Sequence, residues 1–189
     1  MQVETQLNIA VVTVSDTRTE ETDTSGNVLV EALESAGHSL HSKIIIKDDV
    51  YDLRATISAH IADPKVNAIL TTGGTGFTAR DNTQKALQPL FDLHIDGFGE
   101  LFRQLSYEEI GNSTVQSRVF AGLANGTIIF CLPGSPGACR TGWSKIIVDQ
   151  LDSGHKPCNF VDNLRIEYRA QSESFAMLYT CLDNMVTCH

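Results

Sequence analysis

The fold of this chain is organised around residues 68–83, which read AILTTGGTGFTARDNT. A short apolar run ends in two threonines, and glycine then occupies three of the four positions from 73 to 76. Glycine lets the backbone turn with positive φ and lets a ligand come close to main-chain N–H groups. The polar residues that follow open a helix, and a helix N-terminus offers unpaired N–H donors with a partial positive charge. A strand, a glycine loop and a helix start together predict an anion site, with phosphate as the usual anion.

Asp81 adds a metal to this prediction. A carboxylate repels a phosphate unless a cation lies between them, so the stretch indicates phosphate together with a divalent ion, Mg²⁺. The alternative is that Asp81 caps the helix that begins near Thr83, or pairs with Arg80.

The surrounding sequence alternates between β-branched apolar runs and amphipathic segments. Such alternation is typical of an α/β fold with a mostly parallel sheet and helices on both faces. The strands are expected over residues 7–14, 40–46, 66–72 and 127–132. A first helix is expected from Ser25 or Gly26 to Gly37, with Thr24 or Ser25 as N-cap, and a second over 50–62, with Asp48 or Asp49 as N-cap. Asn82 or Thr83 would cap a short third helix, and two more are expected over 97–110 and 113–123. The last begins at Pro136, is capped by Ser135 and ends at about Leu151.

Polar residues recur where these strands end. In an open α/β sheet, ligands bind outside the carboxyl ends of the strands. Four segments are expected there and together predict one pocket: Ser15-Asp16, Asp48-Asp49, the glycine loop with Asp81, and Pro133-Gly134-Ser135. The alternatives are structural: Ser15-Asp16 as a turn, one of Asp48 and Asp49 as a helix cap, and Ser135 as a helix cap whose neighbouring N–H groups still offer a second anion site.

Other nucleotide motifs fit less well. The glycine loop lacks the Gly-Lys-Ser/Thr ending of a P-loop. Gly74, Gly76 and Ala79 match G-x-G-x-x-A, but they follow the third strand, and no acidic residue stands about 20 residues on to bind a ribose, which disfavours a dinucleotide-binding oxidoreductase. The six histidines show no metal-ligand spacing, and no serine stands in a nucleophile elbow.

Composition narrows the function classes. A net charge of −9 and a pI of about 5.0 argue against binding to nucleic acid or to an anionic membrane. No apolar run approaches the roughly 20 residues of a membrane span. Residues 1–5 lack the basic start of a signal peptide. The five cysteines form no CxxC pair, which favours a reducing, cytoplasmic location without structural zinc.

Several separated motifs resemble the MoaB/MogA family of molybdenum cofactor biosynthesis proteins. The glycine loop with Asp81, Val14-Ser15-Asp16, Asp23-Thr24-Ser25-Gly26 and Leu132-Pro133-Gly134-Ser135 match the family in order. Residues 105–111, Gln116-Ser117-Arg118 and residues 156–160 resemble the MoaB branch. The resemblance covers about residues 7–163. We therefore expect a molybdopterin-binding domain over residues 1–165 and a C-terminal extension of unknown role over 166–189.

The resemblance implies a three-layer α/β/α, MogA-like fold that assembles into trimers or hexamers; Phe91 and residues 98–102 would suit such a subunit interface. It also implies transfer of AMP from Mg-ATP to the molybdopterin phosphate, with Asp81 and Asp48 as catalytic and Mg²⁺-holding residues and Asp49 as the alternative to Asp48. One position departs from the pattern: Gly126 stands where many active adenylyltransferases carry a serine. The alternative function is a non-catalytic molybdopterin- or nucleotide-binding carrier or scaffold. The implied substrate-binding residues are Ser15, Asp16, Gly73, Gly74, Thr75, Gly76, Pro133, Gly134 and Ser135.

Overall fold

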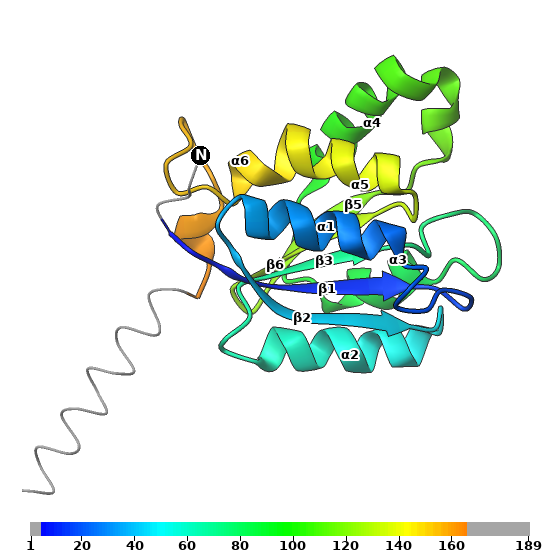
Figure 1. Cartoon of the computed structure of the whole chain (residues 1–189), viewed down its shortest axis with the longest axis horizontal. Helices are drawn as coiled ribbons and strands as arrows, with labels where there is room; N and C mark the ends of the chain where they lie inside the picture. The colour runs from blue at the N-terminus through cyan, green and yellow to red at the C-terminus, as the bar shows by residue number, and fades with distance from the viewer. Residues whose placement is uncertain (1–4, 166–189) are drawn as a thin grey trace, which may run out of the picture.

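The computed structural model describes residues 5–165 of the 189. They form a sheet with helices on both faces (Figure 1). The strands are β1 (Asn8–Val14), β2 (Ser39–Ile46), β3 (Ala68–Thr72), β4 (Leu93–His94), β5 (Phe120–Ala124) and β6 (Thr127–Leu132). The helices are α1 (Thr24–Ser35), α2 (Val50–Ala62), α3 (Thr83–Leu87), α4 (Asp96–Ile110), α5 (Pro136–Gly142) and α6 (Val148–Gln150), with the short segments η1 (Gln88–Leu90), η2 (Gly111–Gln116), η3 (Trp143–Ile147) and η4 (Val161–Asn163).

The sheet has the strand order β2-β1-β3-β6-β5-β4. β2, β1, β3 and β6 run parallel, and β5 and β4 continue the sheet antiparallel. The central strands are buried on both faces, which explains their nearly continuous apolar sequences. The mostly parallel sheet predicted from the sequence is confirmed, with an antiparallel edge that was not predicted.

Two apolar layers enclose the sheet. On one face, side chains of α1, α4, α5 and η3 pack against alternate residues of β1, β3 and β6, with Leu29, Leu33, Phe102 and Ile147 at the centre. On the other face, α2 and α3 cover the remaining residues of the same strands. α1 and α2 lie on opposite sides of the sheet in Figure 1. The expected three-layer α/β/α fold is confirmed.

The expected helix over residues 113–123 is wrong. Residues 111–116 form the short helix η2, and residues 120–124 form β5. Asn125 and Gly126 have φ values of 49° and 70°, which is the two-residue turn that joins antiparallel strands, so β5 and β6 form a hairpin. An apolar run as short as FAGLA does not distinguish helix from strand, and the Asn-Gly pair was the missed signal.

Two helix boundaries also differ from expectation. The N-cap of α1 is Asp23, not Thr24 or Ser25, and its Oδ1 accepts the Gly26 N–H at 2.9 Å. The last predicted helix begins with Ser135 as N-cap, as expected, but it is not one regular α-helix. It consists of α5, the π-helical segment η3 and the short helix α6 in succession.

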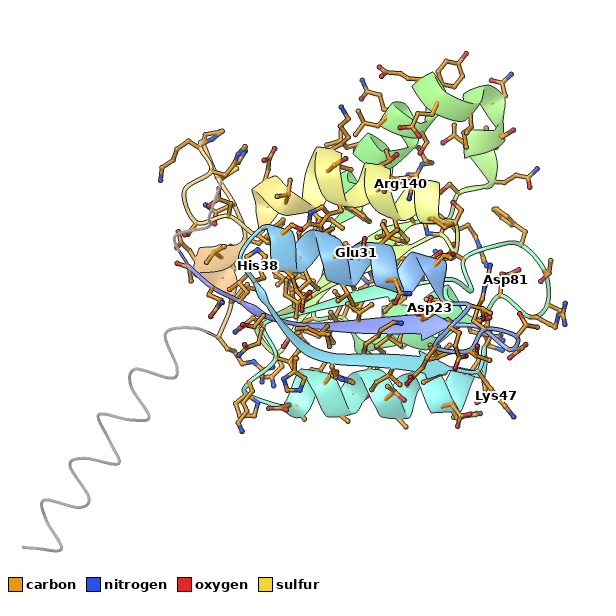
Figure 2. All side chains as sticks on the ribbon, in the orientation of Figure 1. Asp23, Glu31, His38, Lys47, Asp81 and Arg140 are labelled. Atoms are coloured by element: carbon orange, nitrogen blue, oxygen red, sulfur yellow. The ribbon has the colours of Figure 1, made fainter. Side chains whose placement is uncertain are left out.

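Of the residues expected at a subunit interface, Phe98 and Phe102 are buried, Phe91 is partly buried and Leu101 is exposed. Phe98 and Phe102 are 3% and 1% exposed and pack in the core, and Phe91 packs against Phe120. Large apolar side chains are instead exposed at Leu93 on the edge strand and along α4 and η2, at Leu101, Tyr107, Ile110 and Val115. His38 and Asp81 mark the two ends of the sheet in Figure 2. The predicted extension, residues 166–189, lies outside the described residues.

Candidate functional site

The carboxyl ends of the parallel strands lie along one edge of the sheet, where hydrogen bonds connect the loops that follow the strands. The Ser15 N–H donates to the Ile46 carbonyl at 2.8 Å, and the Gly73 N–H donates to the Leu132 carbonyl at 3.0 Å. The Thr72 hydroxyl donates to the Pro133 carbonyl at 2.9 Å. β1 lies between β2 and β3, so the connections from successive strands run to opposite sides of β1. In open α/β sheets, a ligand crevice is expected at the point where the strand order reverses in this way.

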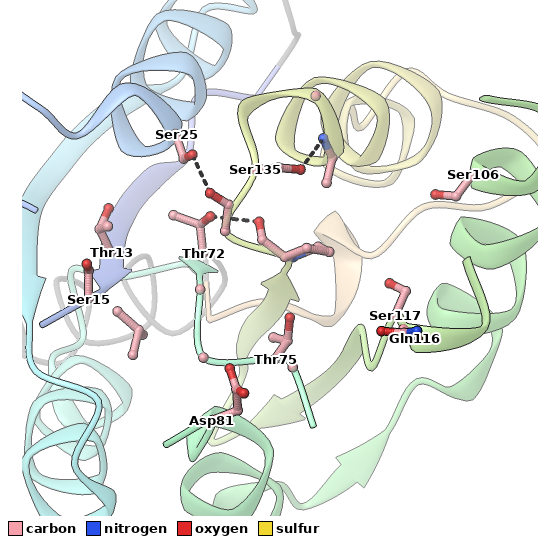
Figure 3. A pocket seen from close by; sticks show the side chains of 18 of the residues that line it. Thr13, Ser15, Ser25, Thr72, Thr75, Asp81, Ser106, Gln116, Ser117 and Ser135 are labelled. Atoms are coloured by element: carbon pink, nitrogen blue, oxygen red, sulfur yellow. Dashed lines mark hydrogen bonds between the residues drawn. The ribbon is translucent and has the colours of Figure 1, made fainter. Parts of the chain in front are cut away.

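A cavity of about 610 Å³ opens at this edge (Figure 3). Its volume lies within the range of small-molecule sites. Its walls are the ends of β1 and β3, the glycine loop, the start of α5, and the α4–η2 segment. The predicted site residues that line it are Ser15, Gly73, Gly74, Thr75, Gly76, Asp81, Pro133, Gly134 and Ser135. Asp16 and Asp48 do not line it.

The glycine loop leaves main-chain donors open to the cavity. Gly73 and Gly74 have φ values of 101° and 63°, in the left-handed region that favours glycine. Their carbonyls are held by Thr83, whose hydroxyl donates to Gly73 at 2.9 Å and whose N–H donates to Gly74 at 3.1 Å. Among the described residues, the N–H groups of Gly74 and Thr75 have no hydrogen-bond acceptor. The loop therefore offers donors of the kind that bind an anion.

Asp81 neither caps α3 nor pairs with Arg80. Its Oδ2 accepts the Thr78 N–H at 2.8 Å and the Thr78 hydroxyl at 2.6 Å. A Cβ atom at position 76 would lie 2.7 Å from Oδ2, so a larger residue than glycine there would displace the carboxylate. Burial alone would raise the pKa of Asp81, but hydrogen bonds from Thr78 and the Gly76 N–H and the charge of Arg118 together lower it. The carboxylate is thus ionised and fixed at the cavity wall.

The ambiguity between Asp48 and Asp49 is resolved by helix capping. Oδ1 of Asp49 accepts the N–H groups of Tyr51 at 2.7 Å and Asp52 at 3.1 Å, so Asp49 is the N-cap of α2. Asp48 points toward the glycine loop, and a Cβ atom at Gly74 would lie 2.7 Å from its Oδ2. Its Oδ1 accepts the Asn82 N–H at 2.9 Å.

The carboxylates at this edge interact with one another. Burial raises the pKa of Asp48, the hydrogen bonds from Asn82 lower it, and the negative charges of Asp81 and Asp16 raise it further. A cation between these groups would relieve the repulsion. Within residues 5–165, no group of three or more His, Cys, Asp or Glu side chains could hold a metal ion. The donor set therefore fits Mg²⁺ that is bound by one or two carboxylates and completed by substrate phosphates, as Mg²⁺ commonly is.

Sequence reasoning missed two parts of the site. Asp23 lines the cavity but is only 1% exposed. Its buried carboxylate is satisfied within the chain, because Oδ2 accepts the Thr13 hydroxyl at 2.9 Å and pairs with Lys43 at 3.2 Å. An Asp three residues before Gly26 is an N-cap signal that could have identified it. The α4–η2 wall, with Ser106 and Glu109, lies in a stretch that resembles the MoaB branch, but no local pattern placed it at the site, since only tertiary packing brings it to the cavity.

Gly126 lies away from the cavity. It is in the turn between β5 and β6, at the amino end of β6, whereas the cavity is at the carboxyl end of that strand. The residue at this position therefore does not line the cavity in this chain, and its positive φ explains why it is a glycine.

Comparison with known proteins agrees with this geometry. Residues 10–153 match the family model described as a probable molybdopterin binding domain. The chain belongs to the MoaB/MogA family. Molybdenum cofactor biosynthesis protein B of Escherichia coli is 53% identical over 157 residues, which cover 83% of this chain and 92% of that protein. The protein of the same name from Bacillus cereus is 44% identical, over 82% of this chain and 90% of its own length.

Solved structures of the family share the fold. A crystal structure of a molybdenum cofactor biosynthesis protein B has a TM-score of 0.77 at 44% identity and covers 79% of this chain and 94% of its own. The tungsten cofactor synthesizing protein MoaB from Pyrococcus furiosus has a TM-score of 0.69 at 36% identity, over 76% and 92%. The predicted family and its MoaB branch are confirmed, and membership gives this MoaB/MogA protein a role in molybdenum cofactor biosynthesis. Among its described residues, no helix is long and apolar enough to cross a membrane.

Proposed function

We propose that this protein is a molybdopterin adenylyltransferase that transfers AMP from Mg-ATP to molybdopterin. A phosphate oxygen of molybdopterin attacks the α-phosphorus of ATP. The new P–O bond forms as the bond to the bridging oxygen of the β-phosphate breaks, and pyrophosphate leaves with the electron pair.

The observation that carries this proposal is the pairing of open backbone donors with fixed carboxylates. Gly74 and Thr75 line the cavity, and their N–H groups have no acceptor among the described residues; Asp81 lines the same wall, and Asp48 lies against Gly74. A phosphate nucleophile is already anionic near neutral pH and needs no general base. The chain has to orient the phosphates and neutralise developing charge, which is how phosphoryl transfer is generally accelerated.

The carboxylates suit a metal that arrives with the nucleotide. Asp81 and Asp48 would hold Mg²⁺, directly or through water, and the ion would supply charge neutralisation for the pyrophosphate leaving group. Without a cation, the acidic side chains of the cavity wall would repel a polyphosphate. The glycine loop would bind the phosphate oxygens by its N–H groups, and the start of α5, capped by Ser135, would offer a second set of donors.

The test is an adenylylation assay with molybdopterin and Mg-ATP that follows pyrophosphate release. In Asp81→Asn, the amide oxygen can still accept the hydrogen bonds from Thr78, but the negative charge is lost. We therefore expect turnover to fall about 100-fold or more. Asp162→Asn is the matched control, because Asp162 is exposed on η4 and lines no part of the cavity. Parent-like turnover in Asp81→Asn would overturn the role of that carboxylate.

A specific observation favours the alternative, a non-catalytic binding protein of the same pathway. Among the described residues that line the cavity, Arg18 is the only basic side chain, whereas Asp23, Asp81 and Glu109 are acidic. This lining complements a triphosphate poorly unless a cation is bound. Calorimetry that shows tight binding of molybdopterin or a nucleotide, with no pyrophosphate released from ATP, would select this alternative.

We also propose a homo-oligomer, a trimer or a hexamer. The support is the set of exposed apolar side chains on α4 and η2, which includes Tyr107, Ile110 and Val115. Exposed apolar side chains that gather on one face commonly mark an interaction surface. Light scattering of the full chain tests this, and Val115→Glu should shift the mass toward the monomer.

A further inference from the structure

Arg118 lies outside the cavity, behind the glycine loop, in the segment between η2 and β5. Its Nε donates to the Thr75 carbonyl at 3.2 Å. Its Nη2 donates to the carbonyls of Gly76 and Asp81, the latter at 3.2 Å. The guanidinium also stacks over the ring of Phe77, 4.8 Å from its centroid. One side chain thus binds three carbonyls of the loop that carries the proposed site.

Each of these carbonyls belongs to a peptide whose N–H points the other way. The peptide bond is planar and trans, so an anchored carbonyl fixes the direction of the N–H on the same peptide. The peptide of the Thr75 carbonyl carries the N–H of Gly76, and the Asp81 carboxylate lies directly against Gly76. The peptide of the Asp81 carbonyl carries the Asn82 N–H, which donates to Oδ1 of Asp48 at 2.9 Å. Arg118 is therefore linked through one peptide to each of the two carboxylates.

We propose that Arg118 is a positioning residue that holds the loop from Thr75 to Asp81 and thereby sets the carboxylates of Asp81 and Asp48, without touching a substrate. This inference rests on the proposed function, because it deepens the account of the same site. The fixed, planar fork of a guanidinium satisfies three separated carbonyls at once, and the single ammonium of lysine does not. A lysine at this position would supply the positive charge but would not hold all three carbonyls.

The test combines hydrogen exchange with ligand binding in the full chain. Arg118→Lys keeps the charge but loses the fork, and Arg118→Met removes both. Arg140→Met is the control, because Arg140 is an exposed arginine on α5 that lines neither the cavity nor the loop (Figure 2). Magnesium with inorganic pyrophosphate is the probe, since it needs no turnover and no pterin.

We expect exchange of the hydrogen-bonded amides of Thr78, Asp81 and Asn82 to rise about tenfold or more in both Arg118 variants, with exchange in β1, β3 and β6 unchanged. The affinity for Mg-pyrophosphate should fall about tenfold in Arg118→Met, the scale of a few lost charge-assisted hydrogen bonds. Millimolar guanidinium should restore part of the affinity in Arg118→Ala, which simple loss of folding would not allow.

The outcomes separate the two proposals. Loop exchange that stays at the parent rate, or Mg-pyrophosphate affinity in Arg118→Met within twofold of the parent, overturns the role of Arg118. If the loop exchange rises but the parent chain itself binds no Mg-pyrophosphate, the positioning of the loop stands and the proposed adenylyl transfer fails.

Discussion

The two ends of the same central strands are built in opposite ways. At the amino end, the backbone groups beside Asn67 and Arg165 are paired within the chain. The side chain of Asn67 accepts the Asn8 N–H at 2.9 Å, and its backbone bonds both Asn8 and Ile128. Arg165 donates to the carbonyls of Asp63 and Val66 at 3.0 and 3.3 Å. At the carboxyl end, N–H groups of the glycine loop stay without an acceptor among the described residues.

The two ends therefore have different roles: the amino end of the strands supports the fold, and the carboxyl end holds the proposed binding site. Buried polar groups that lack partners cost free energy, so a closed amino end supports the fold. The carboxyl end keeps donors and carboxylates at the wall of a cavity, where a ligand can satisfy them. Substitutions at the carboxyl end should therefore alter ligand binding with little change in stability. Substitutions at the amino end should alter stability with little change in ligand binding.

The largest effect is expected from Gly74→Ala. Its φ of 63° strains an alanine, and the added Cβ would collide with the Thr83 hydroxyl and lie 2.7 Å from Asp48 Oδ2. We expect affinity for Mg-pyrophosphate to fall about 100-fold, equivalent to roughly 2.7 kcal/mol. Titration calorimetry measures it. Gly97→Ala is the control, since a Cβ there meets nothing within 4 Å, and an equal loss in that variant would break the contrast between the ends.

Arg165→Ala should show the opposite separation. It leaves the carbonyls of Asp63 and Val66 and the Thr127 hydroxyl without this donor, which we expect to cost about 2 kcal/mol of unfolding free energy. Urea unfolding measures the loss. Mg-pyrophosphate affinity should stay at the parent value, and a fall of tenfold would show that the two ends are coupled.

Gly126→Ala tests the same end by backbone strain. An alanine at φ of 70° is disfavoured, and its Cβ would press on the Arg165 side chain, 2.5 Å from Cγ. We expect a destabilisation of about 1 kcal/mol and unchanged turnover. Reduced turnover at full stability would contradict the placement of Gly126 away from the site.

The smallest effect concerns pH and His38, which is 4% exposed. Its Nδ1 accepts the Leu7 N–H at 3.3 Å. Burial lowers the pKa of His38, opposed in part by the negative charge of Asp152. The unfolded chain then takes up the proton at higher pH than the folded chain, so stability is fully present above the unfolded pKa of about 6.5 and is lost as pH falls below it.

Thermal melts at pH 7 and pH 5 measure this loss. His38→Gln keeps an acceptor for the Leu7 N–H but cannot take up a proton, so its melting temperature should depend less on pH than that of the parent. His94→Gln, at an exposed histidine, should leave the parent's pH dependence intact. Parallel pH dependence in all three proteins would exclude His38 as the cause.

Local sequence patterns were sufficient for the parallel core and for the glycine loop. The β-branched runs of β1, β3 and β6 and the amphipathic spacing of α1, α2 and α4 have strong periodicities, so their positions were predicted within a few residues. The hairpin of β5 and β6 was missed because a five-residue apolar run has no reliable period. Asp48 could not be distinguished from Asp49, because adjacent carboxylates have the same local signal.

By itself, then, the sequence determined the alternation of strands and helices, the position of the glycine loop after β3 and the family, since these depend on residue types at short spacing. The tertiary structure decided which aspartate caps α2 and which faces the loop, that the α4–η2 segment forms a wall of the cavity, and that Arg118 holds the loop from behind. The physical reason is that these relations join residues 34 to 43 positions apart, such as Asp48 with Asn82 and Arg118 with Thr75, which only the packing of the sheet brings within hydrogen-bond distance.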